Sequence, residues 1–119
     1  MIKNSYTKGL WAEIIAAIFL FLKGYRICAW RYKTAVGEID LVARRGRILA
    51  FVEVKARPDY ATGLSAIRPS SHSRLQRAAE HYLARFPTQG SGRDIRFDLV
   101  VVTPPCRIWH LDNIILSGS

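Results

Sequence analysis

Two acidic residues and a lysine stand inside stretches that are otherwise strongly apolar. Asp40 lies in Gly-Glu-Ile-Asp-Leu-Val-Ala, and Glu53 and Lys55 lie in Phe-Val-Glu-Val-Lys-Ala-Arg. A carboxylate between branched apolar neighbours costs desolvation energy, so a functional reason is expected for it. Two carboxylates on one surface can bind Mg²⁺ or Mn²⁺, whose bound water can act as a nucleophile. The spacing is typical of a metal-dependent nuclease, in which Lys55 orients or deprotonates the attacking water or stabilises the developing charge.

The surrounding residues predict a β-hairpin that positions this chemistry. Residues 38–44 and 48–55 alternate between polar and branched apolar side chains with period two. With Arg45-Gly46 as a two-residue turn, position 44 pairs with 47, so Asp40 faces Phe51 and Glu38 faces Glu53. Asp40, Glu53 and Lys55 then share one face. The other face is apolar and should pack on the core; it carries Ile39, Leu41, Ala43, Ile48, Ala50, Val52 and Val54.

The acidic residues also have interpretations that involve no catalysis. Asp40 and Glu53 could form an ion-pair network with Lys55. Glu13 could be an acid near the start of a helix, favoured there by the helix dipole, or a member of the site. Glu38 could be a solvent-side hairpin residue or a residue that supports the site.

Several other polar residues are expected to be structural or solvated. Asp98 follows Arg96-Phe97 and is expected to order the end of a sheet or to pair with an arginine rather than to bind metal. The histidines are scattered along the chain and are expected at the surface: His72, His81 and His110. Cys28 and Cys106 have no zinc-site spacing, so they are predicted to be small buried residues in a reducing cytoplasm.

Motifs along most of the chain match one protein family. They are Glu13 with Ala16, Lys23-Gly24-Tyr25, Gly37-Glu38-Ile39-Asp40, Phe51-Val52-Glu53-Val54-Lys55 with Arg57, Gly63, Ala78-Ala79 with Tyr82-Leu83, and Arg96-Phe97-Asp98. On these residues the chain resembles the YraN-like family of small bacterial proteins, within the PD-(D/E)xK nuclease superfamily. The hairpin portion is the most specific part of the resemblance.

At 119 residues the chain is expected to be a single domain over residues 1–119, and the resemblance implies a restriction-endonuclease-like core. It implies that Asp40, Glu53 and the Val54 carbonyl hold Mg²⁺ or Mn²⁺, that Lys55 assists the attack, and that Glu13 completes the site. The nearest analogue in the superfamily is the archaeal type of Holliday junction resolvase. That analogy favours a structure-selective DNA endonuclease acting on branched DNA, and it suggests a homodimer.

The start of the second long helix departs from the family pattern. The chain reads Pro69-Ser70-Ser71-His72 where relatives usually offer a lysine, so a helper cation would be missing. One alternative function is therefore a nucleic-acid-binding module that keeps the fold without turnover. A second alternative is an RNA-directed nuclease, which would share the chemistry but accept A-form geometry.

Composition favours a polyanionic partner. The chain has 119 residues, 18 Lys and Arg against 9 Asp and Glu, and a net charge of +9. Arginine forks suit phosphate oxygens, so nucleic acid is the expected partner, with DNA favoured. The arginines that could line a phosphate track beside the carboxylates are Arg44, Arg45, Arg47, Arg57, Arg68, Arg74 and Arg77.

The remaining pattern predicts an α/β fold of order α-β-β-β-α-β-β, a mixed sheet flanked by helices. Residues 9–22 form an apolar helix ending at Gly24, and its uninterrupted apolar run is too short to span a membrane. Residues 25–33 form a strand, residues 58–69 a loop, residues 95–102 a central strand and residues 107–111 an edge strand. The helix between the loop and the central strand has an apolar stripe; it carries Leu75, Ala78, Ala79, Tyr82, Leu83 and Phe86.

Overall fold

The protein is built around one mixed five-stranded sheet. The computed structural model describes residues 5–65 and 69–114. Its strands are β1 (Arg26–Thr34), β2 (Gly37–Arg45), β3 (Ile48–Ala56), β4 (Asp94–Thr103) and β5 (Arg107–Leu111). They lie side by side in sequence order; β3 and β4 are parallel, and the other neighbours are antiparallel. The predicted mixed sheet is confirmed, with β4 inside it and β5 at its edge.

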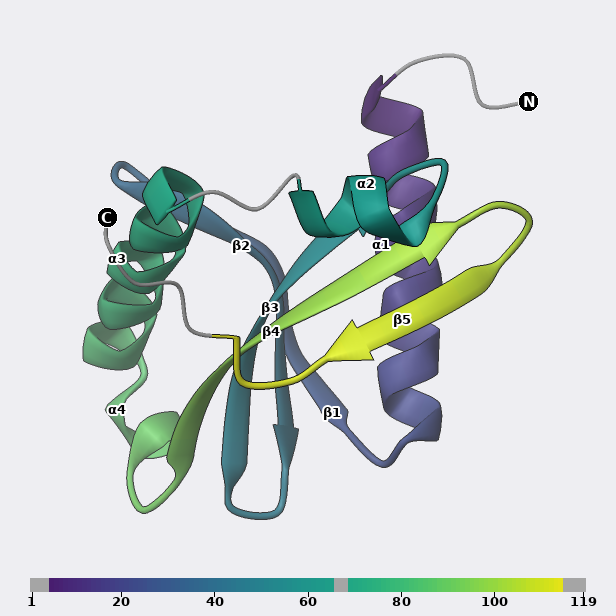
Figure 1. Cartoon of the computed structure of the whole chain (residues 1–119). Coiled ribbons are helices and arrows are strands. Elements are labelled where there is room, and N and C mark those ends of the chain that lie inside the picture. The colour runs from purple at the N-terminus through teal and green to yellow at the C-terminus, as the bar shows by residue number, and fades with distance from the viewer. Residues whose placement is uncertain (1–4, 66–68, 115–119) are drawn as a thin grey trace.

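Helices cover both faces of this sheet (Figure 1). Helix α1 (Ser5–Leu22) packs on one face and α3 (Pro69–Arg85) on the other. Two short helices, α2 (Tyr60–Ser65) and α4 (Pro87–Gly90), join the longer elements. The predicted element order is compatible with this arrangement, although α2 occupies part of the segment that was expected to be only a loop.

Each long helix buries a stripe of regularly spaced residues. In α1, Ala12, Ala16 and Leu20 recur every four residues and are fully or almost fully buried, and the two alanines let the helix approach the sheet closely. In α3, the buried residues recur as predicted and pack on the other side of the sheet; they are Leu75, Ala78, Ala79 and Tyr82. The two cores interleave along the strands, because alternate side chains point to opposite faces.

The β2–β3 hairpin has a different register from the one predicted. Arg45 pairs with Ile48, so the turn residues are Gly46 and Arg47 rather than Arg45 and Gly46. Gly46 has φ +58°, a left-handed conformation that glycine adopts without steric cost and that suits the first turn position of a type II′ hairpin. The paired positions therefore sum to 93 rather than 91, as in Leu41 with Val52. Because the shift is two residues, the side chains of the paired stretch 41–52 keep their predicted faces.

The regular pairing of β2 with β3 ends beside Asp40. The last paired residues are Leu41 and Val52. Leu41 belongs to the core under α1, whereas Ile39 belongs to the core under α3. The expectation that Ile39 and Leu41 share a face is therefore wrong, because the alternation is interrupted at Asp40. This irregularity allows the Asp40 side chain to hydrogen-bond to β3 backbone in place of a strand carbonyl.

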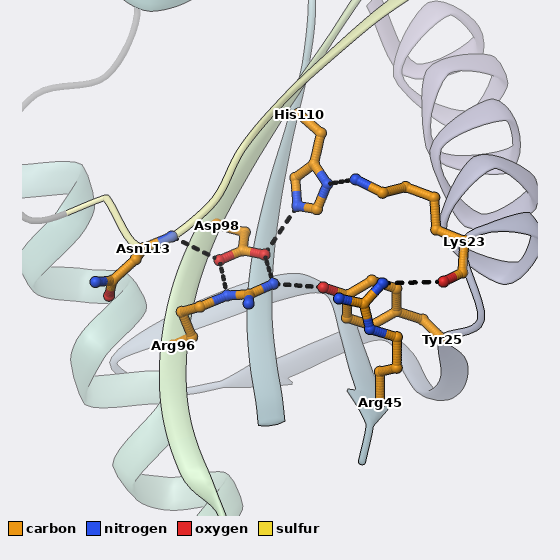
Figure 2. A network of polar contacts seen from close by, with 7 residues as sticks. All are labelled: Lys23, Tyr25, Arg45, Arg96, Asp98, His110 and Asn113. Atoms are coloured by element: carbon orange, nitrogen blue, oxygen red, sulfur yellow. Dashed lines mark hydrogen bonds and ion pairs between the residues drawn. The ribbon is translucent and has the colours of Figure 1, made fainter. Parts of the chain in front are cut away.

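A second polar cluster lies within the sheet, at the end where α1 stops (Figure 2). Asp98 is fully buried and accepts two hydrogen bonds from Arg96, at 2.9 and 2.8 Å, and one from the Asn113 N–H at 2.9 Å. His110 Nε2 donates to Asp98 at 2.9 Å, and Lys23 Nζ donates to His110 Nδ1 at 2.7 Å. The predicted pairing of Asp98 with an arginine is confirmed. The cluster ties α1, β4 and β5 together without leaving the buried carboxylate unpaired.

The predicted positions of two histidines and two cysteines are wrong. His72 is buried, and the His110 ring is only 4% exposed because it lies between Asp98, Phe19 and Tyr25. Cys28 is half-buried and Cys106 is exposed, so the two cysteines are not buried core residues.

Helix α1 exposes several large apolar side chains in its described part. Ile14, Ile18, Phe21 and Leu22 are exposed there. Among the described residues, no helix is both long enough and apolar enough to cross a lipid bilayer.

Candidate active site

A cleft of about 330 Å³ opens between the hairpin strands and the start of α3. It is lined by Glu38, Asp40, Glu53, Val54, Lys55, Ser71, Arg74 and Leu75. The cleft therefore brings together Asp40, Glu53, Val54 and Lys55, which the sequence predicted to form a site. It adds Glu38 from β2 and one turn of α3.

Asp40 is held by the backbone of the neighbouring strand. Its Oδ2 accepts a hydrogen bond of 2.7 Å from the Val54 N–H. Burial raises the pKa of Asp40 from 3.8 to about 7, and the Val54 hydrogen bond opposes this shift. The negative charges of Glu13 and Glu53 raise the pKa further, whereas Lys55 lowers it. The surroundings of Asp40 therefore disfavour its ionised form.

Glu53 and Lys55 form a close ion pair. Lys55 Nζ lies 2.9 Å from Glu53 Oε2, and about four-fifths of each side chain is shielded from solvent. An ion pair of this kind was the non-catalytic interpretation of the acidic residues. It accounts for Glu53 but not for Asp40, which has no ion-pair partner among the described residues.

Glu13 is buried in the middle of α1 rather than near its start. Its Oε1 accepts hydrogen bonds from Trp30 Nε1 at 2.8 Å and from Arg31 Nε at 2.6 Å. Arg31 has φ +54°, a left-handed conformation that is uncommon for a side chain of its size. The helix-dipole interpretation of Glu13 is wrong, because α1 has no acidic residue in its first turn. Glu13 instead contributes negative charge near Asp40.

The cleft has more acids than cations. Its lining carries the three carboxylates of Glu38, Asp40 and Glu53 against the two cations Lys55 and Arg74. Among the described residues Lys55 pairs with Glu53 and Arg31 pairs with Glu13, whereas neither Asp40 nor Glu38 has an ion-pair partner. Among the described residues, no three His, Cys, Asp or Glu side chains converge to form a complete metal cage. Two carboxylates and a strand carbonyl still fit Mg²⁺ or Mn²⁺, because these ions keep several waters and bind through one or two carboxylates. The residues that can hold such an ion are Asp40, Glu53 and Val54.

Gly37 explains why α3 can approach the carboxylates. A Cβ at this position would collide with the Arg74 carbonyl oxygen, so only glycine permits the close contact between β2 and α3. The first turns of α3 consequently place Ser71 and Arg74 in the cleft. Ser71 stands where the family resemblance predicts a lysine. Arg74, one turn further along, supplies a cation to the same cleft.

The predicted nucleic-acid arginines do not gather in one place. Arg74 lines the cleft, and Arg77 follows it on the exposed side of α3. Arg57 is half-buried and donates to the Ala56 carbonyl at 2.8 Å. Arg68 lies outside the described residues. The three remaining arginines, Arg44, Arg45 and Arg47, lie at the hairpin tip.

The tip arginines are far from the carboxylates. Gly46 lies six residue steps beyond Asp40, a distance of roughly 20 Å at ~3.3 Å per step. Arg45 turns toward α1, where it donates to the Lys23 carbonyl at 3.0 Å and stacks 4.7 Å from the centre of the Tyr25 ring (Figure 2). The tip arginines are therefore not among the residues that line the cleft, and their role in nucleic-acid binding stays a prediction.

Sequence reasoning missed the residues that hold Glu13. Trp30 and Arg31 hydrogen-bond to Glu13 of α1, and Arg31 does so from a left-handed backbone conformation. No periodic signal marks such a residue. Sequence reasoning also missed that Leu75 lines the cleft, because its spacing identified it only as a core residue.

Comparison with known proteins gives one consistent family. The model of the uncharacterised protein family UPF0102 matches residues 12–102. A UPF0102 protein of Parvibaculum lavamentivorans is 51% identical over 100 residues, covering 84% of this chain and 74% of the relative. A UPF0102 protein of Chelativorans is 46% identical over 114 residues, covering 94% of this chain and 90% of the relative.

Proposed function

The chain belongs to the uncharacterised protein family UPF0102, and we propose that it is a metal-dependent endonuclease that hydrolyses phosphodiesters in DNA. This membership confirms the YraN-like resemblance seen in the sequence. The observation that carries the proposal is the position of Asp40. It is an acid without an ion-pair partner among the described residues, in a cleft shared with Glu53, Lys55 and Arg74.

A divalent cation would serve this reaction in two ways. It would supply the positive charge that the carboxylate cluster lacks, and it would activate water as a nucleophile and stabilise charge on the phosphate. Mg²⁺ or Mn²⁺ suits the oxygen donors Asp40, Glu53 and the Val54 carbonyl. Glu13, fixed by Trp30 and Arg31, would complete the negative field around the ion.

The protein's own residues would position the reacting groups. Hydrolysis joins a water oxygen to phosphorus and breaks the bond to one ester oxygen, which leaves with a proton. Lys55 lines the cleft, and its ammonium group pairs with Glu53. Lys55 can therefore orient the water or offset the charge on the phosphate. Arg74 and the start of α3 add positive charge on the opposite wall.

Branched DNA is the favoured substrate by analogy with junction resolvases, and two copies of the chain would then resolve a junction symmetrically. The alternative of a binding module without turnover rested on the missing lysine at Ser71. Arg74 weakens that argument, because it brings a cation to the same cleft.

Cleavage of defined nucleic acids tests the proposal. Labelled four-way junction, flap, duplex, single-stranded DNA and RNA would be incubated with the protein in Mg²⁺ or Mn²⁺. We expect metal-dependent cutting of a DNA substrate, reduced by about 10²–10⁴-fold in Glu53→Gln and in Lys55→Ala. The matched control is Glu80→Gln, which removes an exposed carboxylate from α3 and should leave the rate within twofold.

Three results would contradict the proposal. Cutting that survives in both variants would come from another site or a contaminant. Binding without cutting in either metal would favour the non-catalytic module. Cutting of RNA alone would favour the RNA-directed nuclease.

A further inference from the structure

Helix α3 carries a row of basic side chains on one side. Arg74, Arg77, His81 and Arg85 are all exposed and recur at i, i+3, i+7 and i+11. At 3.6 residues per turn they fall within an arc of about 80°. The acidic residue of α3, Glu80, lies about 100° from the centre of that arc. We call these four residues the α3 row.

The α3 row begins inside the candidate active site. Arg74 lines the cleft together with Asp40, Glu53 and Lys55. The contact between Gly37 and the Arg74 backbone fixes the start of α3 against β2. The row then runs away from the cleft along the helix toward α4 (Figure 1). Positive charge thus continues from the cleft along one line on the surface.

Two members of the row beyond the cleft have defined positions. His81 Nδ1 shares a hydrogen bond of 2.8 Å with the Tyr32 hydroxyl of β1. The Arg85 guanidinium lies 5.4 Å from the centre of the Phe86 ring. Side chains that are already oriented lose less rotamer freedom when a ligand binds, so they contribute more to affinity.

We propose that the α3 row binds the backbone of the nucleic-acid strand that flanks the scissile phosphate. The proposal rests on the proposed function and adds the path that the substrate takes. From Arg74 to Arg85 the helix rises about 16 Å at ~1.5 Å per residue. A strand of B-form DNA advances ~3.4 Å per nucleotide, so the row spans about five nucleotides on one side of the cut. The contacts are to phosphates, so they carry no sequence preference.

The hairpin tip offers a matched control of equal charge. Arg44 and Arg47 lie at the tip, remote from the cleft, whereas Arg77 and Arg85 belong to the row and lie outside the cleft. The test compares two double variants. One carries Arg77→Gln together with Arg85→Gln, and the other carries Arg44→Gln together with Arg47→Gln. Each variant loses two positive charges. Thermal unfolding of both checks that the fold is retained.

Binding would be measured without turnover. Fluorescence anisotropy with a labelled 24-base-pair duplex in EDTA gives the dissociation constant from 50 to 300 mM salt. Losing two phosphate contacts should reduce the slope of log affinity against log salt by about 1.8, so the loss of affinity grows by roughly 60-fold between 1 M and 100 mM salt. The tip variant should keep a slope within 0.5 of the unmodified protein.

The outcomes separate this inference from the proposed function. A reduced slope in the row variant alone supports the inference even if no substrate is cut. Equal reductions in both variants, or none in either, would overturn it even if the protein cleaves DNA. The inference would also be overturned if poly-glutamate displaced the labelled duplex when its carboxylate concentration equals the phosphate concentration of the DNA. The row would then be a surface for an acidic polypeptide.

Discussion

Replacing Asp40 by asparagine should stabilise the metal-free protein at neutral and alkaline pH. The substitution keeps an oxygen that can accept the Val54 N–H and removes the charge that the surroundings disfavour. The pKa of Asp40 rises from 3.8 to about 7 on folding, a shift of about three pH units. At ~1.4 kcal/mol per unit the ionised form costs up to about 4 kcal/mol. Asp40 is only half-buried, so solvent should screen this to about 2 kcal/mol.

The sign of the pH dependence follows from proton binding. Below pH 3.8, Asp40 is protonated in both the folded and the unfolded chain and carries no penalty. Between pH 3.8 and about 7 the folded chain holds a proton that the unfolded chain has lost, so the free energy of unfolding falls as pH rises. Above pH 7 the full penalty is present. The gain from Asp40→Asn should therefore be near zero at pH 4 and largest at pH 8.

Urea unfolding in EDTA at pH 4, 6 and 8 measures this difference. Asp98→Asn is the matched control with the opposite sign. Burial by itself would raise the pKa of Asp98, but hydrogen bonds from His110, Arg96 and the Asn113 N–H outweigh it and lower the pKa. Removing that charge should cost about 3 kcal/mol, because it breaks a buried pair with Arg96. A destabilised Asp40→Asn protein at pH 8, or a gain that does not change with pH, would refute the reasoning about the carboxylate cluster.

Three further substitutions test the way the cleft is built. Gly37→Ala should lower the free energy of unfolding by about 1–3 kcal/mol in urea, because the new Cβ meets the Arg74 carbonyl oxygen. Gly9→Ala, whose Cβ would meet open space within α1, should instead raise it by about 0.5–1 kcal/mol; a loss of stability there would contradict the helix assignment. Trp30→Phe removes one hydrogen bond to buried Glu13 and should cost about 1–2 kcal/mol in thermal unfolding, and an unchanged melting temperature would mean that Arg31 alone holds the carboxylate.

The alternation of side chains along a strand explains which parts of the site could be predicted from the sequence. The shared face of Glu53 and Lys55 follows from the two-residue repeat of a strand, and a two-residue error in register leaves it unchanged. Asp40 lines the same cleft although the alternation of β2 is interrupted beside it. The register itself depends on which two residues form the turn. In the structure the left-handed backbone of Gly46 places the turn at Gly46-Arg47. The sequence alone is compatible with a turn at either Arg45-Gly46 or Gly46-Arg47.

Long-range contacts explain which parts could not be predicted. Glu13 meets Trp30 and Arg31 only because α1 crosses β1 at that point, and the His110 ring is buried only because Asp98 lies across from it on β4. Neither relation leaves a periodic pattern along the chain. The apolar stripe of α3 was predicted correctly, because helix periodicity is local.

The hydrogen bond from Val54 to Asp40 gives the protein a built-in spectroscopic reporter. A strand N–H normally points at a carbonyl whose charge never changes, but the Val54 N–H points at a group that can take up a proton. The amide resonance of Val54 in a ¹H–¹⁵N spectrum should therefore move when Asp40 titrates. The same resonance should move again when a cation binds the carboxylate, so a single peak can follow occupation of the cleft in the absence of any nucleic acid.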